Sequence, residues 1–115
     1  MNSRLKLPNV TLSAAACVNV AATVRAMERC LQQVEFGRAL LFTDVEIADL
    51  PEGLERVAIA PLRSSQDYSR IVLHDLGDWI DTTHCLIVQW DGFILDAGAW
   101  DPAFLDLDYI GAPWP

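Results

Sequence analysis

Residues 85–95 have the sequence CLIVQWDGFIL, in which two apolar runs are separated by Gln-Trp-Asp-Gly. A short apolar run bounded by polar residues is typical of a strand that is buried on both faces of a sheet. The sequence therefore predicts a central strand over residues 84–91, and Gly92 allows the chain to bend where that strand ends. Gln89 and Asp91 are expected to project from the same side of the strand, because successive side chains alternate.

Two interpretations of Asp91 follow from its local sequence. At the carboxyl end of a central strand it would lie where open α/β sheets bind their ligands. The dipeptide Asp91-Gly92 between two strands is also a strong signal for a β-hairpin turn. The spacing alone favours neither the ligand site nor the hairpin.

Before this stretch, sequence patterns typical of strands are interspersed with patterns typical of helices. Apolar runs predict three earlier strands, at residues 10–18, 38–43 and 56–60. Apolar residues spaced three and four apart predict two helices of about 15 residues, one after Asn19 and one after Ser64. Asn19 is expected to cap the start of the first helix and Gly37 its end. This order predicts an α/β fold, a three-layer sandwich with a mostly parallel sheet.

The composition is that of one acidic, foldable domain. Its 115 residues and 52% hydrophobic content are sufficient for a core. The formal net charge of −8 argues against nucleic acid as a partner, because phosphate backbones favour clustered Lys and Arg. No apolar stretch reaches the ~20 residues of a membrane span, so we expect a cytoplasmic protein. Residues 1–9 are polar and basic and predict a loose leader before one domain at 10–115.

The cysteines predict buried free thiols rather than a zinc site or a nucleophile. Cys17, Cys30 and Cys85 are odd in number and lack C-x-x-C spacing. His74 and His84 have no metal-ligand spacing, so neither is a candidate ligand or base. Glycine-rich dinucleotide, P-loop and G-x-S-x-G motifs are absent from the sequence.

Polar residues near the ends of the predicted strands are the candidates for a site, because the carboxyl ends of parallel strands share one edge. These candidates are Asn19, Asp44, Ser65, Arg70, Gln89 and Asp91. Several have a structural alternative. Asn19 and Ser65 are equally explained as helix caps, and Asp44 as a residue of a turn. Arg70 could form a surface ion pair instead of reaching a diphosphate.

Two motifs carry a family resemblance, QWDGF at 89–93 and DYIGAPW at 108–114. With them, residues 10–115 resemble a family catalogued as of unknown function and related to glycosyltransferases. The resemblance implies a GT-A-like (Rossmann-like) nucleotide-sugar transferase, in which a strand ends in Asp-x-Asp; here residues 89–91 are Gln-Trp-Asp. It implies that Asp91 holds Mg²⁺ or Mn²⁺ against the diphosphate of a nucleotide-sugar such as a UDP-sugar. Gln89 would hydrogen-bond the ribose or a phosphate.

The resemblance also implies that relatives continue beyond residue 115 with elements of the acceptor side. We therefore expect a nucleotide-binding half that transfers sugar only if the acceptor half is supplied elsewhere. The alternative is a non-catalytic interaction module with a vestigial site, which the glutamine in place of the first aspartate favours. We also expect a homo-oligomer or a partner chain over residues 93–115, because that segment is rich in aromatic and aliphatic residues.

Overall fold

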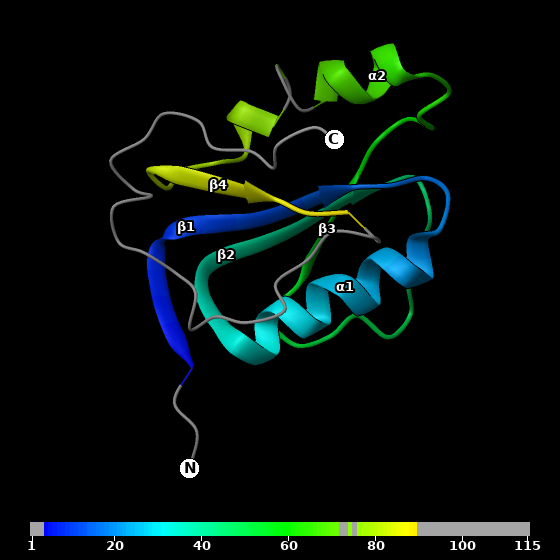
Figure 1. The fold of residues 1–115 in the computed structure, drawn as a ribbon. Helices are drawn as coiled ribbons and strands as arrows, with labels where there is room; N and C mark the ends of the chain where they lie inside the picture. Colours follow the sequence, from blue (N-terminus) through cyan, green and yellow to red (C-terminus); the bar gives the residue numbers. More distant parts are fainter. Residues whose placement is uncertain (1–3, 72–73, 75, 90–115) are drawn as a thin grey trace, which may run out of the picture.

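The computed structural model describes residues 4–71, 74 and 76–89, which form a sheet with helices on both faces (Figure 1). The strands are β1 (Leu5–Ala15), β2 (Val34–Thr43), β3 (Glu55–Ala58) and β4 (His84–Ile87). They form one sheet in the order β3-β2-β1-β4, and all three strand pairs are parallel. The predicted α/β sandwich with a parallel sheet is confirmed.

The helices cover opposite faces of this sheet. α1 (Val20–Gln33) joins β1 to β2 and lies on one face, and α2 (Ser65–Arg70) lies on the other (Figure 1). A short 3-10 helix, η2 (Leu76–Asp78), follows α2. From β3 the chain crosses the α2 face and returns beside β1 as β4. The strand order therefore reverses at the β1–β4 pair.

Side-chain alternation along β2 fills a core on each face. Leu41 packs with Leu12 and Met27 under α1, whereas Leu40 and Phe42 pack on the other face. Residues of β2 from Ala39 to Thr43 are all buried. An unbroken buried run of this kind is what a strand covered on both faces requires.

α1 forms where it was predicted, but the side chain of Asn19 does not cap it. Asn19 occupies the N-cap position in the left-handed conformation (φ 53°), and its side chain makes no capping hydrogen bond. Its carbonyl oxygen instead accepts hydrogen bonds from the backbone N–H of Thr23 (2.9 Å) and from the Thr23 hydroxyl (3.0 Å). Asn tolerates a positive φ better than most residues, which explains its place at this sharp turn.

The predicted leader is wrong for residues 5–9, because β1 begins at Leu5. Leu5 to Leu7 pair with Val34 to Phe36 of β2, and the register shifts between Leu7 and Thr11. Pro8 lies within that shift, where a residue without a backbone N–H is tolerated. Proline therefore marks an irregularity inside the strand and not a loop before it.

Gly37 is not the C-cap that its sequence position predicts. α1 ends at Gln33, β2 starts at Val34, and Gly37 lies within β2. A Cβ atom at position 37 would clash with the backbone carbonyl of Pro8. Glycine is needed here because two backbones approach each other closely.

The second helix begins where it is predicted but changes type along its length: α2 covers Ser65–Arg70, and Ile71 and His74 are π-helical. Its start is as expected: Ser64 Oγ accepts from the Asp67 N–H (3.2 Å), and Asp67 Oδ2 accepts from the Arg63 N–H (3.0 Å). The regular α-helix nevertheless ends at Arg70, and η2 contains Gly77, a weak helix former.

The predicted central strand also differs from its expected bounds. β4 spans His84–Ile87 rather than residues 84–91, and Gln89 follows it. Trp90, Asp91 and Gly92 lie outside the described residues, as does the apolar segment at 93–115. No helix in the described part of the chain is long and apolar enough to cross a membrane.

Side-chain hydrogen bonds join β4 to β1. Ser13 Oγ lies 2.9 Å from Cys85 Sγ, and the hydroxyls of Thr11 and Thr82 are 2.6 Å apart. Burial raises the pKa of the Cys85 thiol, and the hydrogen bond with Ser13 partly opposes that effect. All three cysteines lie in described segments and none forms a disulfide, as predicted.

Replacement of Gly37 by alanine should lower the free energy of unfolding by about 1–3 kcal/mol, because Pro8 or β2 must move to accommodate the methyl group. Urea unfolding of the variant measures the loss. Gly77→Ala is the matched control, since a Cβ there meets nothing within 4 Å. Equal stability of the two variants would show that the approach of Pro8 imposes no constraint.

The raised pKa of Cys85 should make stability fall at alkaline pH. The folded protein keeps the thiol proton more tightly than the unfolded chain does, so this contribution is complete below the ordinary thiol pKa. It is lost as the pH rises from that value through the folded pKa. Urea unfolding from neutral to alkaline pH should give a steeper decline for the natural protein than for Cys85→Ala. Parallel profiles would contradict the burial effect.

Candidate functional site

A pocket of ≈ 250 Å³ lies at the carboxyl end of the sheet, beside the β1–β4 pair where the strand order reverses. The described residues that line it come from four segments of the chain. They are Ala15, Ala16, Cys17, Val18, Thr23, Leu62, Tyr68 and Gln89. In open α/β sheets, ligands bind at this position, outside the carboxyl ends of the strands.

The turn from β1 into α1 builds one wall of the pocket. Ala16 N–H donates to the Phe42 carbonyl (3.0 Å), so this wall is fixed to the end of β2. Small side chains at positions 15 and 16 leave space beside the strand. The left-handed turn at Asn19 then redirects the chain, and Val18, which is 77% exposed, lies at the rim.

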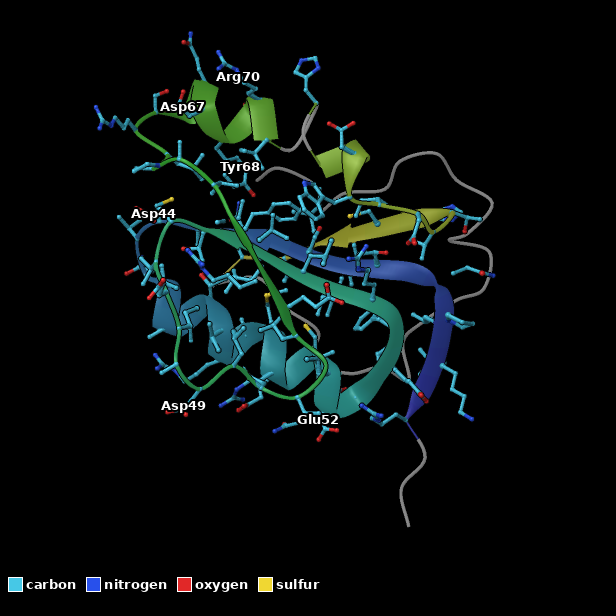
Figure 2. All side chains as sticks on the ribbon, turned by 180° about the vertical axis from the view of Figure 1, so that it is seen from behind. Asp44, Asp49, Glu52, Asp67, Tyr68 and Arg70 are labelled. Carbon is cyan, nitrogen blue, oxygen red and sulfur yellow. The ribbon has the colours of Figure 1, made fainter. Side chains whose placement is uncertain are left out.

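The opposite wall comes from the connection between β3 and α2 and from α2 itself. The Leu62 N–H donates to Cys17 Sγ (3.3 Å), which joins the two walls. Tyr68 extends from α2 toward the sheet (Figure 2), and its hydroxyl accepts a hydrogen bond from Gln89 Nε2 (3.2 Å). This bond joins α2 to the segment that follows β4.

The described lining of the pocket carries no charged side chain. Thr23 uses its hydroxyl hydrogen on Asn19, whereas the Tyr68 hydroxyl still has a donor and Gln89 still has a carbonyl oxygen for a ligand. Apolar walls with an aromatic ring and an amide suit a small uncharged group that also forms hydrogen bonds.

The sequence candidates are distributed unevenly around this pocket. Gln89 lines it, and Asn19 follows the lining residue Val18 but is exposed and does not itself line the pocket. Asp44 is exposed just after β2, and Arg70 is exposed and points away from the sheet (Figure 2). Ser65 is the first residue of α2, and Asp91 lies outside the described residues. The structure therefore does not bring Asp44 and Arg70 together with Gln89.

Sequence reasoning missed Tyr68 and Cys17 as pocket residues, whereas residues 61–65, which include the lining residue Leu62, are expected at this edge of the sheet. Tyr68 falls within the helix predicted after Ser64, and Cys17 is predicted to be a buried free thiol. Cys17 is half-buried and lies after the end of β1, whereas the sequence pattern places it inside the predicted strand at 10–18 and gives no signal for this role. The contact between Cys17 and Leu62 joins residues 45 positions apart, which no local pattern reveals.

The described residues do not fit a divalent cation. Among them no group of three or more His, Cys, Asp or Glu side chains could hold a metal, and the described lining contains no carboxylate. Carboxylate oxygens are the ligands that Mg²⁺ and Mn²⁺ prefer. Asp91, the expected ligand, is not among the described residues.

A larger cavity of ≈ 450 Å³ lies at the amino ends of β2 and β3. It has Arg4 and Arg38 together with Glu35, Glu52 and Glu55 around it. Arg38 Nη2 pairs with Glu55 Oε2 at 3.1 Å, and this hydrogen bond and the Glu55 charge raise the pKa of Arg38. Its position is opposite to the end at which α/β sheets bind ligands, so the smaller pocket is the stronger candidate.

Comparison with known proteins gives a family for the chain. The model of the family described as "Protein of unknown function (DUF5672)" matches residues 53–115, more than half of the sequence. The chain belongs to this family. The match includes Leu62, Tyr68 and Gln89, but the β1 wall of the pocket precedes it, so the expected resemblance over 10–52 has no support from this match. No curated protein and no solved structure matches the chain.

Proposed function

We propose that this chain binds a nucleotide-sugar, with the pocket at the β1–β4 pair as part of the binding site, as in a GT-A-like glycosyltransferase domain. The observation that supports the proposal is the position of the pocket. The order β3-β2-β1-β4 matches the first four strands of a doubly wound sheet, which binds nucleotides in the crevice where its strand order reverses.

Gln89 is the polar residue that would contact the nucleotide in this proposal. It follows β4, its side chain is exposed in the pocket, and its amide carbonyl can accept a hydrogen bond from a nucleotide. Tyr68 presents an aromatic ring and a hydroxyl on the facing wall. Transfer of the sugar would further require an acceptor side, to which we assign no residue of this chain.

In this proposal, Asp91 is the one residue that would hold a divalent cation. Asp91 is two residues beyond Gln89 in the sequence. Mg²⁺ or Mn²⁺, when bound, would offset the charge of the diphosphate, which a chain of net charge −8 otherwise repels.

The alternative function is a non-catalytic interaction module whose site is vestigial. The observation that favours it is the uncharged lining of the described pocket, which lacks a carboxylate for a metal or for acid–base chemistry. The two functions differ in whether the protein binds a nucleotide at all.

Replacement of Gln89 by alanine should weaken the binding of UDP-glucose, measured by titration calorimetry with Mn²⁺ present. Loss of one hydrogen bond corresponds to about 1 kcal/mol, or roughly fivefold in Kd. Gln66→Ala is the matched control, because Gln66 is exposed on α2 and does not line the pocket. If the natural protein binds neither UDP-glucose nor UDP, with or without Mn²⁺, the interaction module replaces the transferase proposal.

Replacement of Asp91 by asparagine tests the metal separately. Asparagine keeps the shape of the side chain and removes the charge, so UDP binding should lose its dependence on Mn²⁺, at a cost of about 1–3 kcal/mol. Calorimetric titration with and without the cation measures this. Asparagine is also a good turn former, so unchanged Mn²⁺ dependence would assign Asp91 to the hairpin turn instead.

A further inference from the structure

The two walls of the pocket are anchored to the sheet very differently. The β1 wall continues directly from a strand that pairs with both β2 and β4, and α1 packs against that strand. The opposite wall belongs to residues 59–70, which we call the β3–α2 segment. It pairs with no other described strand beyond the bond from Ile59 N–H to the Thr43 carbonyl (3.2 Å).

Few side chains hold the β3–α2 segment in place. Ile59 and Leu62 are partly buried against the core, and Ile71, just beyond α2, is buried beside Phe42. The remaining side chains of the segment described as exposed are Ala60, Pro61, Arg63, Ser64, Gln66, Ser69 and Arg70. The segment therefore gains little from burial between its two ends.

Among the described residues, two hydrogen bonds cross the pocket from this segment. One runs from the Leu62 N–H to Cys17 Sγ (3.3 Å) and the other from Gln89 Nε2 to the Tyr68 hydroxyl (3.2 Å). A thiol is a weak acceptor, so the bond to Tyr68 is the stronger of the two. Both must break for the walls to separate.

The hydrogen bonds at the N-terminus of α2 do not involve the sheet. Ser64 caps it through Asp67, and Asp67 binds back to the Arg63 N–H, so both bonds are internal to the segment. α2 is short and continues into Ile71, whose N–H bonds to the Asp67 and Tyr68 carbonyls and whose side chain is buried beside Phe42, so α2 depends on this attachment to the core.

We propose that the β3–α2 segment is a gate over the pocket and that the hydrogen bond between Tyr68 and Gln89 closes it. Opening moves Leu62 and Tyr68 away from the β1 wall, exposes Cys17 further and releases the Gln89 amide from Tyr68. A ligand that binds the Gln89 side chain competes directly with Tyr68 for it, so occupancy of the pocket and closure of the gate are coupled. The gate itself rests on the protein geometry, whereas a nucleotide as its ligand rests on the proposed function.

The alkylation rate of the Cys17 thiol measures gate opening in the absence of a ligand. Cys17 lies against Leu62 in the closed pocket, whereas Cys30 is fully buried in the core under α1. When closing is faster than the chemical step, the alkylation rate of a thiol is proportional to the population of the open state. Iodoacetamide labelling followed by peptide mass spectrometry measures both thiols in the same sample.

In the ligand-free full chain, Tyr68→Phe should raise the labelling rate of Cys17 roughly threefold to tenfold, the change in population that the loss of one hydrogen bond allows. Labelling of Cys30 should not change. Ser69→Ala, which removes a hydroxyl from an exposed position of the same helix, is the control and should leave both rates unchanged.

Gln89→Ala removes the other end of the same bond, so it should match Tyr68→Phe, and the double variant should label no faster than either single one. It also serves as the test if Tyr68→Phe folds poorly. An unchanged Cys17 rate in both single variants would overturn the gate. So would a rise in Cys30 labelling equal to that of Cys17, because global unfolding would then explain both.

Addition of UDP to the natural protein tests the nucleotide-binding proposal separately from the gate. If UDP changes the labelling rate of Cys17 but not that of Cys30, the nucleotide occupies the gated pocket. If UDP has no effect while Tyr68→Phe still accelerates labelling, the gate stands and the nucleotide is the wrong ligand.

Discussion

The structure depends on the parallel pairing of β1 with two neighbours at once. β1 hydrogen-bonds to β2 along one edge and to β4 along the other, and its side chains from Val10 to Ala14 are buried. A strand with no solvent on either edge or face must present small or apolar side chains in both directions. Thr11 and Ser13 satisfy this requirement because their hydroxyls bond across to Thr82 and Cys85. Each other element is positioned by its relation to this strand.

The pocket is a consequence of that arrangement. The chain leaves β1 on the α1 face to form β2, whereas it arrives at β4 from the opposite face. The connections on the two sides of the β1–β4 pair therefore diverge, and described side chains reach across the space between them. Tyr68 and Leu62 do so from one direction and Gln89 from another. The same divergence explains why one wall continues from a strand paired on both edges, whereas the other has one described backbone hydrogen bond to the sheet, from Ile59 to Thr43.

Local patterns predicted the elements better than their ends. The alternation of apolar runs with helical spacing gave the order of strands and helices, because burial on one or two faces imposes those periods. Pro8 and Gly37 misled the assignment, since each is usually a sign of a loop or a helix end. Here they mark one place where β1 and β2 approach closely. That approach joins residues distant in sequence, so no window of residues contains the information.

The candidate site was predictable at Gln89 and, within residues 61–65, at Leu62. Both follow strands, and strand ends can be read from a sequence. Tyr68 and Cys17 became pocket residues through hydrogen bonds to Gln89 and Leu62, whose partners are 21 and 45 positions away. Asp44 follows β2 and is exposed, whereas the direction of Arg70 depends on how α2 is rotated over the sheet (Figure 2).

The position of β4 beside β1 also determines the order in which the chain can fold. β1, α1 and β2 are consecutive and form a compact unit from nearby residues, whereas the Thr83 hydroxyl reaches the Asn9 carbonyl across 74 positions. Closing that long loop has a larger entropic cost and follows the local steps. Until β4 arrives, one edge of β1 carries unpaired backbone groups beside an apolar face. An unpaired strand edge can pair with a second chain, so the pairing of β4 with β1 also removes a surface on which chains could associate.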